Sequence, residues 1–121
     1  MLFKITSLEY KLKNHFILRK KNLIIKKNKH FLLLGPSGCG KTTFINSMTG
    51  LLKPSSGEII FENKNYSLLS EKEIDSLRSK NFGLIFQKLH LIKHLNIKQN
   101  ISLAKNKSHF LNINELINDI G

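Results

Sequence analysis

A glycine-rich stretch in the first third of the chain has the spacing of a phosphate-binding loop. The residues from Gly35 to Thr42 match G-x-x-x-x-G-K-[ST] without a gap. Gly38 and Gly40 allow backbone conformations that side chains disfavour, so that successive N–H groups turn inward and form a nest for phosphate oxygens. The alternative is a glycine-rich turn that holds no ligand. The complete match favours phosphate binding.

The end of the loop supplies the remaining chemistry. Lys41 would neutralise the β- and γ-phosphates as a point charge. Thr42 offers a hydroxyl to Mg²⁺, which prefers oxygen ligands, and Thr43 would assist at the α-phosphate. A helix after Lys41 would add the positive end of its dipole. The candidate residues of the loop are Gly35, Pro36, Ser37, Gly38, Cys39, Gly40, Lys41, Thr42 and Thr43.

Such a loop must be held between a strand and a helix. Phe31 to Leu34 form a continuous apolar run that leads directly into Gly35, and such a run is typical of a strand covered on both faces. After the loop, apolar residues recur at helical spacing, and Gly50 marks the expected end of the helix. The context therefore agrees with the motif.

The rest of the chain alternates short strands with turns and helices. Strands are predicted at 3–8, 16–18, 23–25, 58–61 and 83–86, and helices at 70–79 and 114–120. Polar turns are expected at 27–30, 54–57 and 62–65. Ser70 stands three residues before Glu73, which is the spacing of a capping box at the start of a helix.

Taken together, these residues resemble ABC-type ATPases, the nucleotide-binding subunits of ATP-driven transporters. The wording Gly-Pro-Ser-Gly-Cys-Gly-Lys-Thr-Thr is often seen in that family. Residues 47–59 look like the run that follows its loop, and residues 77–87 and 89–101 are similar to the region of its Q-loop. The resemblance implies an α/β fold of the P-loop NTPase type, in which this chain is the N-terminal half: an antiparallel β subdomain plus the start of the RecA-like core.

The same resemblance assigns two further site residues. Gln87 would contact Mg²⁺ and the attacking water, so Thr42 and Gln87 are the expected metal ligands. An aromatic ring ahead of the loop would stack on adenine, with Tyr10 as the first candidate and Phe16 as the second. The alternative is that this aromatic residue packs in the core.

The resemblance also implies partners. These are a membrane permease and a second ATP-binding subunit, so that the protein would be cytoplasmic and peripheral at the inner face of the cell membrane. Residues 67–78 look most like the lipoprotein-release, macrolide-export and cell-division subfamilies, and methionine importers look similar there. No nucleic-acid partner is expected.

Several pieces of the family pattern are absent from this sequence. It contains no Leu-Ser-Gly-Gly-Gln segment and no apolar strand that ends in paired acids. We therefore expect residues 1–121 to form an ABC-type ATP-binding domain that is truncated before the signature and Walker B motifs. Such a chain would bind MgATP weakly and hydrolyse it negligibly. An alternative is a non-catalytic relic or a split-gene fragment.

Composition leaves one further alternative open. Residues 1–30 hold nine Lys or Arg and one acid, so they carry +8 of the formal charge of +12. This could mark a basic P-loop module that acts on nucleic acid, but the chain has only two arginines. The single cysteine, Cys39, excludes an intramolecular disulfide, and it is interpreted as a small loop residue rather than a redox switch. The histidines, which show no metal-ligand spacing, are His15, His30, His90, His94 and His109.

Overall fold

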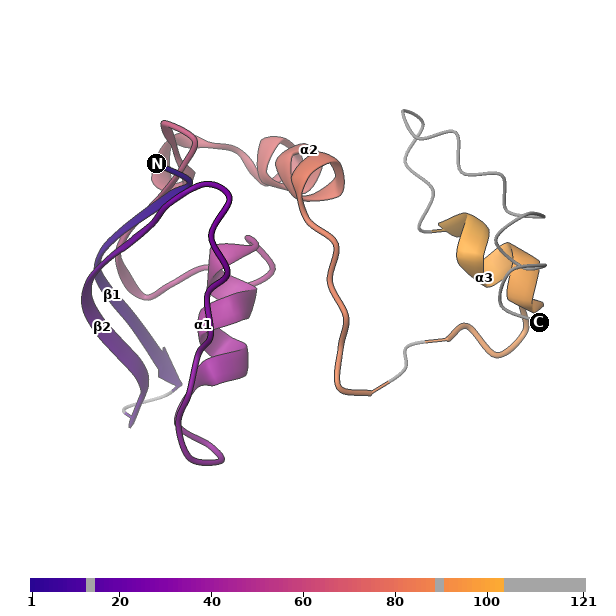
Figure 1. The fold of residues 1–121 in the computed structure, drawn as a ribbon, viewed down its shortest axis with the longest axis horizontal. Helices are drawn as coiled ribbons and strands as arrows, with labels where there is room; N and C mark the ends of the chain where they lie inside the picture. Colours follow the sequence, from indigo (N-terminus) through magenta and orange to yellow (C-terminus); the bar gives the residue numbers. More distant parts are fainter. Residues whose placement is uncertain (13–14, 89–90, 104–121) are drawn as a thin grey trace. The chain divides into compact units, whose positions relative to one another are not determined.

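The computed structural model describes residues 1–12, 15–88 and 91–103. The chain divides into two units (Figure 1): the first, Met1–Arg78, contains the sheet, and the second, which begins at Ser79, contains the last of the described helices. The elements are β1 (Phe3–Leu12), β2 (His15–Ile25), α1 (Lys41–Met48), β3 (Ser56–Phe61), β4 (Lys64–Asn65), the 3₁₀ helix η1 (Tyr66–Leu68), α2 (Glu71–Asn81) and α3 (Ile97–Leu103).

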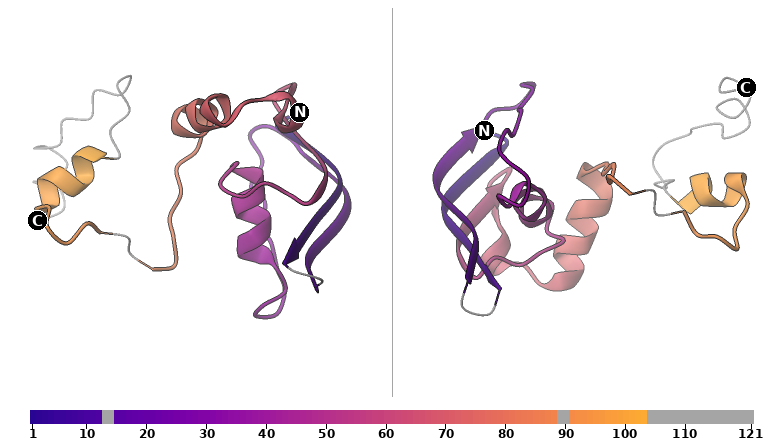
Figure 2. Two further views of the ribbon diagram at one scale, coloured as in Figure 1. Left: turned by 180° about the vertical axis from the view of Figure 1, so that it is seen from behind. Right: turned by 90° about the horizontal axis from the view of Figure 1, so that it is seen from below.

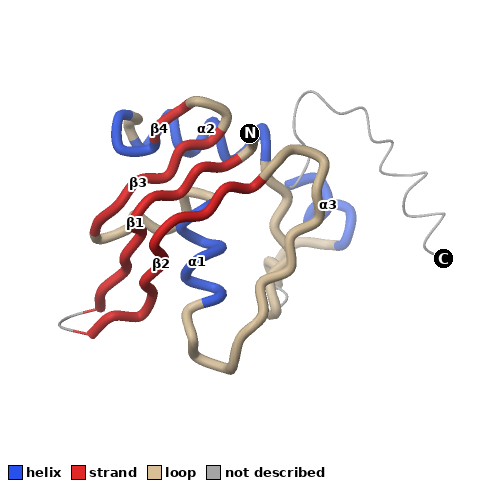
Figure 3. The backbone as a smooth tube through the Cα atoms, turned by 60° about the vertical axis from the view of Figure 1, so that its left-hand side comes forward, coloured by secondary structure: helices blue, strands red, loops and turns tan. Residues whose placement is uncertain are grey.

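The first unit is built on a four-stranded antiparallel sheet in the order β2-β1-β3-β4 (Figure 3). Phe3 lies opposite both Ile25 and Phe61, and Ile5 lies opposite Ile59. These apolar side chains share one face of the sheet, and all five are buried. The ring centroids of Phe3 and Phe61 lie 4.9 Å apart, and the planes of the two rings are tilted by 50° to each other. This end of the sheet therefore forms part of the hydrophobic core of the first unit.

A bulge in β1 keeps the buried face continuous. Ser7 has a φ of +47°, and the register between β1 and β3 shifts between Thr6 and Glu9. The extra residue brings Leu8, rather than Ser7, onto the buried face after Ile5. Gly57, with a φ of +91°, lies against the backbone of Ser7, where a Cβ would clash. The predicted strand at 3–8 is confirmed, with this local adjustment.

Helix α1 lies on one side of the sheet, as Figures 2 and 3 show. Its Phe44 is buried in the core, together with Tyr66 of η1 and Leu77 of α2. The predicted helix after the glycine-rich loop and its end near Gly50 are confirmed, because Thr49 is the C-cap and Gly50 has a φ of +71°. The strand predicted at 58–61 is confirmed within β3.

Two predicted strands are not formed. Residues 31–34 and 83–86 have no strand conformation, although both are apolar and both lie beside predicted site residues. A strand needs a neighbour for its N–H and C=O groups. The described sheet is formed by β1 to β4, and neither run is one of its strands. Phe31, Leu32 and Leu34 are exposed as a result.

The two short strands predicted at 16–18 and 23–25 are one strand. β2 runs from His15 to Ile25, because it pairs with β1 at both ends and in the middle, with a register shift opposite Tyr10 and Lys11. The polar residues Arg19 to Asn22 therefore belong to the strand, and Arg19 forms an ion pair with Glu9 directly across the ladder at 2.9 Å.

In the second unit, α3 has a reciprocal cap at its start. The Gln99 N–H donates to Asn96 Oδ1, and the Asn96 N–H donates to Gln99 Oε1, both at 2.9 Å. The side-chain amide of Asn100 bonds the carbonyls of Ile92 and Leu95 at 3.2 and 3.0 Å. These bonds tie the turn before the helix to its first turn. The helix predicted at 114–120 lies outside the described residues.

Candidate phosphate-binding site

The loop before α1 has the backbone geometry that its glycines allow. Gly38 and Gly40 have φ values of +77° and +90°, in the left-handed region that residues with a side chain rarely adopt. Gly40 is buried, and a Cβ on it would lie 2.6 Å from the Ile17 carbonyl oxygen of β2. Gly38 has nothing within 4 Å of the place that a Cβ would take. Gly40 thus fits the loop against the sheet, while Gly38 faces open space.

The first turn of α1 presents uncapped backbone donors. Gly40 is the N-cap and makes no side-chain capping bond, and the first turn carries no acidic residue. The first helical hydrogen bond is from the Phe44 N–H to the Gly40 carbonyl, at 2.8 Å. The N–H groups of Lys41, Thr42 and Thr43 come before it and add to the positive end of the helix dipole. Such an end favours an anion.

The side chain of Lys41 folds back over the loop. Its Nζ donates to the carbonyls of Gly35 and Pro36, both at 2.7 Å, and lies 3.8 Å from Cys39 Sγ. The ammonium group is therefore held at the rim of the loop and presents its charge there. Thr42 is exposed and Thr43 is half-buried.

An apolar cavity of about 140 Å³ adjoins the loop. Its lining includes Leu18 and Leu23 of β2, Phe31 and Leu33 from the segment before the loop, and Lys41. The sequence pattern does not predict this cavity.

The other predicted site residues are distant from the loop in the sequence. They differ from one another in the element or unit that holds them. Tyr10 is half-buried on β1 and lies opposite Leu18 in the ladder. Phe16 pairs with Lys11 near the start of β2. Gln87 is exposed and belongs to the second unit. The structure therefore brings together the nine consecutive loop residues, and it describes Gln87 within a separate unit.

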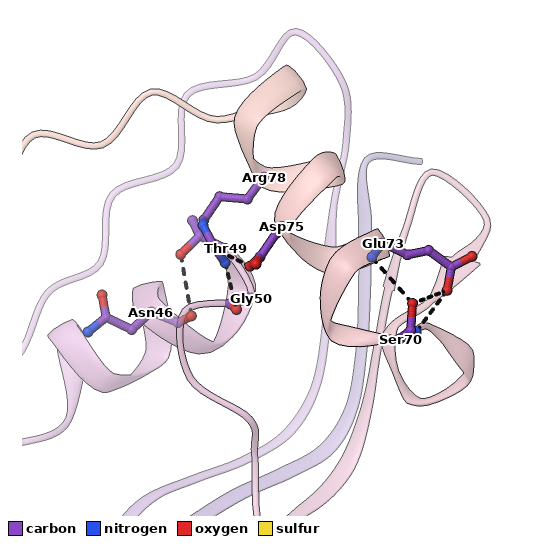
Figure 4. A network of polar contacts seen from close by, with 7 residues as sticks. All are labelled: Asn46, Thr49, Gly50, Ser70, Glu73, Asp75 and Arg78. Carbon is purple, nitrogen blue, oxygen red and sulfur yellow. Dashed lines mark hydrogen bonds and ion pairs between the residues drawn. The ribbon is translucent and has the colours of Figure 1, made fainter. Parts of the chain in front are cut away.

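A contact between helices that the sequence did not predict lies at the far end of α1. Figure 4 shows Arg78 reaching from α2 to Gly50, where its Nη1 donates to the carbonyl oxygen at 3.0 Å. The Tyr66 hydroxyl donates to the Met48 carbonyl at 2.7 Å. For this region the sequence predicts that the helix ends near Gly50, but it does not predict that Arg78 contacts Gly50.

Two absences among the described residues bear on other chemistry. No group of three or more His, Cys, Asp or Glu side chains in this part of the chain could hold a metal ion. Among the helices that the structure describes, none has the length and hydropathy needed to cross a membrane.

The geometry defines an α/β protein with a glycine-rich loop between a sheet and a helix. The family model described as ABC transporter matches residues 18–121. The chain is 42% identical over 91 residues to the spermidine/putrescine import ATP-binding protein PotA of Aster yellows witches'-broom phytoplasma, covering 75% of this chain and 20% of PotA. It is 40% identical over 86 residues to the ABC transporter ATP-binding protein MJ1508 of Methanocaldococcus jannaschii, covering 71% of this chain and 38% of MJ1508.

A solved structure extends this likeness to the fold. The dimeric, post-hydrolysis state of the ATP-binding cassette MJ0796 with ADP and Pi has a TM-score of 0.80 and 27% identity, covering 98% of this chain and 54% of that one. The chain belongs to the ABC transporter family, and its fold is the N-terminal part of an ABC-type P-loop NTPase. Its match spans less than half of the length of either curated relative, PotA or MJ1508.

Proposed function

We propose that this chain is the phosphate-binding part of an ATP-binding subunit of an ABC transporter, and that Gly35 to Thr43 hold the phosphates of MgATP. One observation carries the proposal. Two left-handed glycines, an uncapped helix start and the Lys41 ammonium converge on one loop. The lysine bonds to its own loop carbonyls, so phosphate binding would exchange or extend contacts of a group that is already in place.

Each loop residue would then have a defined part. The N–H groups that follow Gly38 and Gly40 would bind phosphate oxygens, and Lys41 would balance their charge. Thr42 is exposed and carries a hydroxyl of the kind that Mg²⁺ prefers. When bound, the ion would supply charge stabilisation at the phosphates. Gln87 as a second ligand and Tyr10 as the adenine platform remain part of the proposal, and both are accessible at least in part.

The proposal for the whole protein extends to its partners. A second ATP-binding subunit and a membrane permease would complete it, at the inner face of the cell membrane and on its cytoplasmic side. The dimeric state of the MJ0796 cassette and the import role in the name of PotA support this assignment. We assign residues 1–121 to one ATP-binding domain that contains the phosphate loop and the Gln87 segment but neither the signature nor the Walker B motif. Hydrolysis by this chain alone would be negligible, since its sequence has no paired acids after an apolar strand.

Isothermal titration calorimetry with MgATP tests the site. We expect saturable binding by the wild-type chain and its loss in Lys41→Ala. Lys64→Ala, on the exposed strand β4, removes the same charge away from the loop and should bind as the wild type does. Circular dichroism checks that all three chains fold alike. Equal binding by Lys41→Ala and the wild type would refute the assignment of the loop, and so would a folded wild-type chain that binds no MgATP.

A further inference from the structure

Several polar groups lie close together at the carboxyl end of α1. Residues of α1 and of the turn after it form hydrogen bonds with only some of them. The Thr49 hydroxyl donates to the Ile45 carbonyl at 3.0 Å, and the N–H groups of Leu51 and Leu52 donate to the Asn46 carbonyl at 2.8 and 3.1 Å. The last turn of α1 carries no basic residue. The last turn of α1 therefore provides no cation at the negative end of its own helix dipole.

Arg78 of α2 supplies that cation. Its Nη1 donates to the Gly50 carbonyl at 3.0 Å, and its Nη2 lies 2.5 Å from Asp75 Oδ1, one turn earlier on the same helix (Figure 4). The Arg78 side chain is 25% exposed and that of Asp75 is 65% exposed, so the arginine is the more enclosed partner. Asp75 orients one arm of the guanidinium while the other arm holds Gly50.

The surrounding packing fixes the same junction. Gly50 has a φ of +71°, and a Cβ on it would lie 2.5 Å from Ile74 Cγ2 of α2. Ile74 lies one turn before Arg78, on the side of α2 that meets Gly50. Tyr66 adds its hydrogen bond to the Met48 carbonyl from η1. Three side chains from outside α1 thus converge on the residues Met48 to Gly50.

We propose that Arg78 is a positioning residue for phosphate binding, acting through α1. The inference rests on the proposed function, since it assigns a role toward the same loop. α1 has eight residues, so its two ends lie about 12 Å apart and a tilt at Gly50 displaces the N–H groups at Lys41. By holding the carboxyl end of α1 against α2, Arg78 sets where those N–H groups point.

The test compares Arg78→Ala, Arg78→Gln and Arg78→Lys with Arg19→Ala, which removes the only other arginine from an exposed ion pair on the sheet. The first readout is the dissociation constant for MgATP, measured well below each variant's melting temperature so that the chains stay folded. We expect Arg78→Ala to bind about tenfold more weakly. Arg78→Lys should recover most of the affinity by keeping a cation near Gly50, and Arg19→Ala should bind as the wild type does.

The second readout is hydrogen exchange of the backbone amides of Thr42 to Phe44 without nucleotide, which we expect Arg78→Ala to accelerate. Unchanged MgATP affinity in folded Arg78→Ala would overturn the inference. Should Arg78→Ala fail to fold, Arg78→Gln decides by the same affinity criterion. A folded wild-type chain that binds no MgATP would refute the proposed function, and the exchange rates would then decide alone whether Arg78 positions the start of α1.

Discussion

Gly38 and Gly40 share a left-handed backbone but differ in what surrounds them. Alanine at Gly38 would meet no atom within 4 Å, so its cost is that of the backbone conformation, about 1 kcal/mol. Alanine at Gly40 would also press on the Ile17 carbonyl, so it should cost at least about 2–3 kcal/mol. Urea unfolding of the two variants checks the order. Equal losses of stability would contradict the close approach of the loop to β2.

Tyr66 makes stability sensitive to alkaline pH. Burial raises its pKa above the ordinary value of 10.0, because the phenolate would be desolvated. The unfolded chain ionises first, so this contribution is complete below pH 10 and is lost as the pH rises above it. Tyr66→Phe should lose about 1 kcal/mol at neutral pH, through the bond to Met48, and should lose less stability than the wild type above pH 10.

Chemical denaturation at pH 7 and at pH 10.5 measures both effects of Tyr66→Phe. Tyr10→Phe is the matched control, since Tyr10 is a half-buried residue of strand β1. If the wild-type chain and Tyr66→Phe lose the same stability between pH 7 and pH 10.5, burial does not hinder the ionisation of Tyr66.

At the residue scale, the loop could be predicted because its chemistry lies in nine consecutive residues. Spacing alone indicated the left-handed glycines and the lysine, and the φ values of Gly38 and Gly40 agree with that expectation. The contact between Arg78 and Gly50 joins residues 28 positions apart. It depends on how α2 packs, and no local pattern encodes that packing.

At the level of elements, α2 begins with the capping box that the sequence predicts. The Ser70 N–H and hydroxyl donate to Glu73 Oε2 at 2.8 and 2.7 Å, and the Glu73 N–H approaches Ser70 Oγ at 3.4 Å. The hydrogen bonds from Ser70 lower the pKa of Glu73 below its ordinary 4.5. The stabilisation by Glu73 is therefore present above pH 4.5 and is lost as the pH falls below it.

Ser70→Ala should cost about 1 kcal/mol at pH 7, because α2 loses its N-terminal cap. Glu73→Gln should remove the part of the stability loss that appears below pH 4.5. Glu71→Gln is the matched control in the same turn. Thermal unfolding between pH 3 and pH 7 checks all three variants, and an unchanged acid profile in Glu73→Gln would show that the carboxylate contributes nothing.

The elements also show where local patterns fail. Residues 3–8 and 58–61 were predicted as strands and are strands, because each has a neighbour in the sheet. Residues 31–34 and 83–86 have equally strand-like sequences but do not belong to the described sheet, which is formed by β1 to β4. An apolar run therefore predicts that the backbone favours a strand conformation. Hydrogen bonding to a neighbouring strand decides whether a strand forms.

For the whole molecule, this leaves apolar side chains in water beside the site. Leu32 and Leu34 are 77% and 79% exposed, next to Phe31 at 49%. Replacing Leu32 and Leu34 by serine should change the free energy of unfolding by less than about 0.5 kcal/mol per site, and should reduce self-association. Sedimentation velocity and urea unfolding measure the two effects.

Leu8→Ser is the control for that substitution, since Leu8 is fully buried and the same change there should destabilise the first unit strongly. A large loss of stability in the Leu32→Ser, Leu34→Ser double variant would mean that residues 31–34 are covered in solution. That outcome would contradict their exposure in this structure.

The strand order also has a consequence during synthesis of the chain. Phe3 pairs with Ile25 on one side and with Phe61 on the other, so β1 and β2 are complete 36 residues before β3 is. At roughly 5–20 residues per second, the nascent hairpin would wait about two to seven seconds with one edge of β1 open. Charged residues, lysine above all, are what keep such edges from pairing with another chain. The nine Lys and Arg of residues 1–30 would therefore protect the emerging hairpin on the ribosome until Ser56–Phe61 arrives.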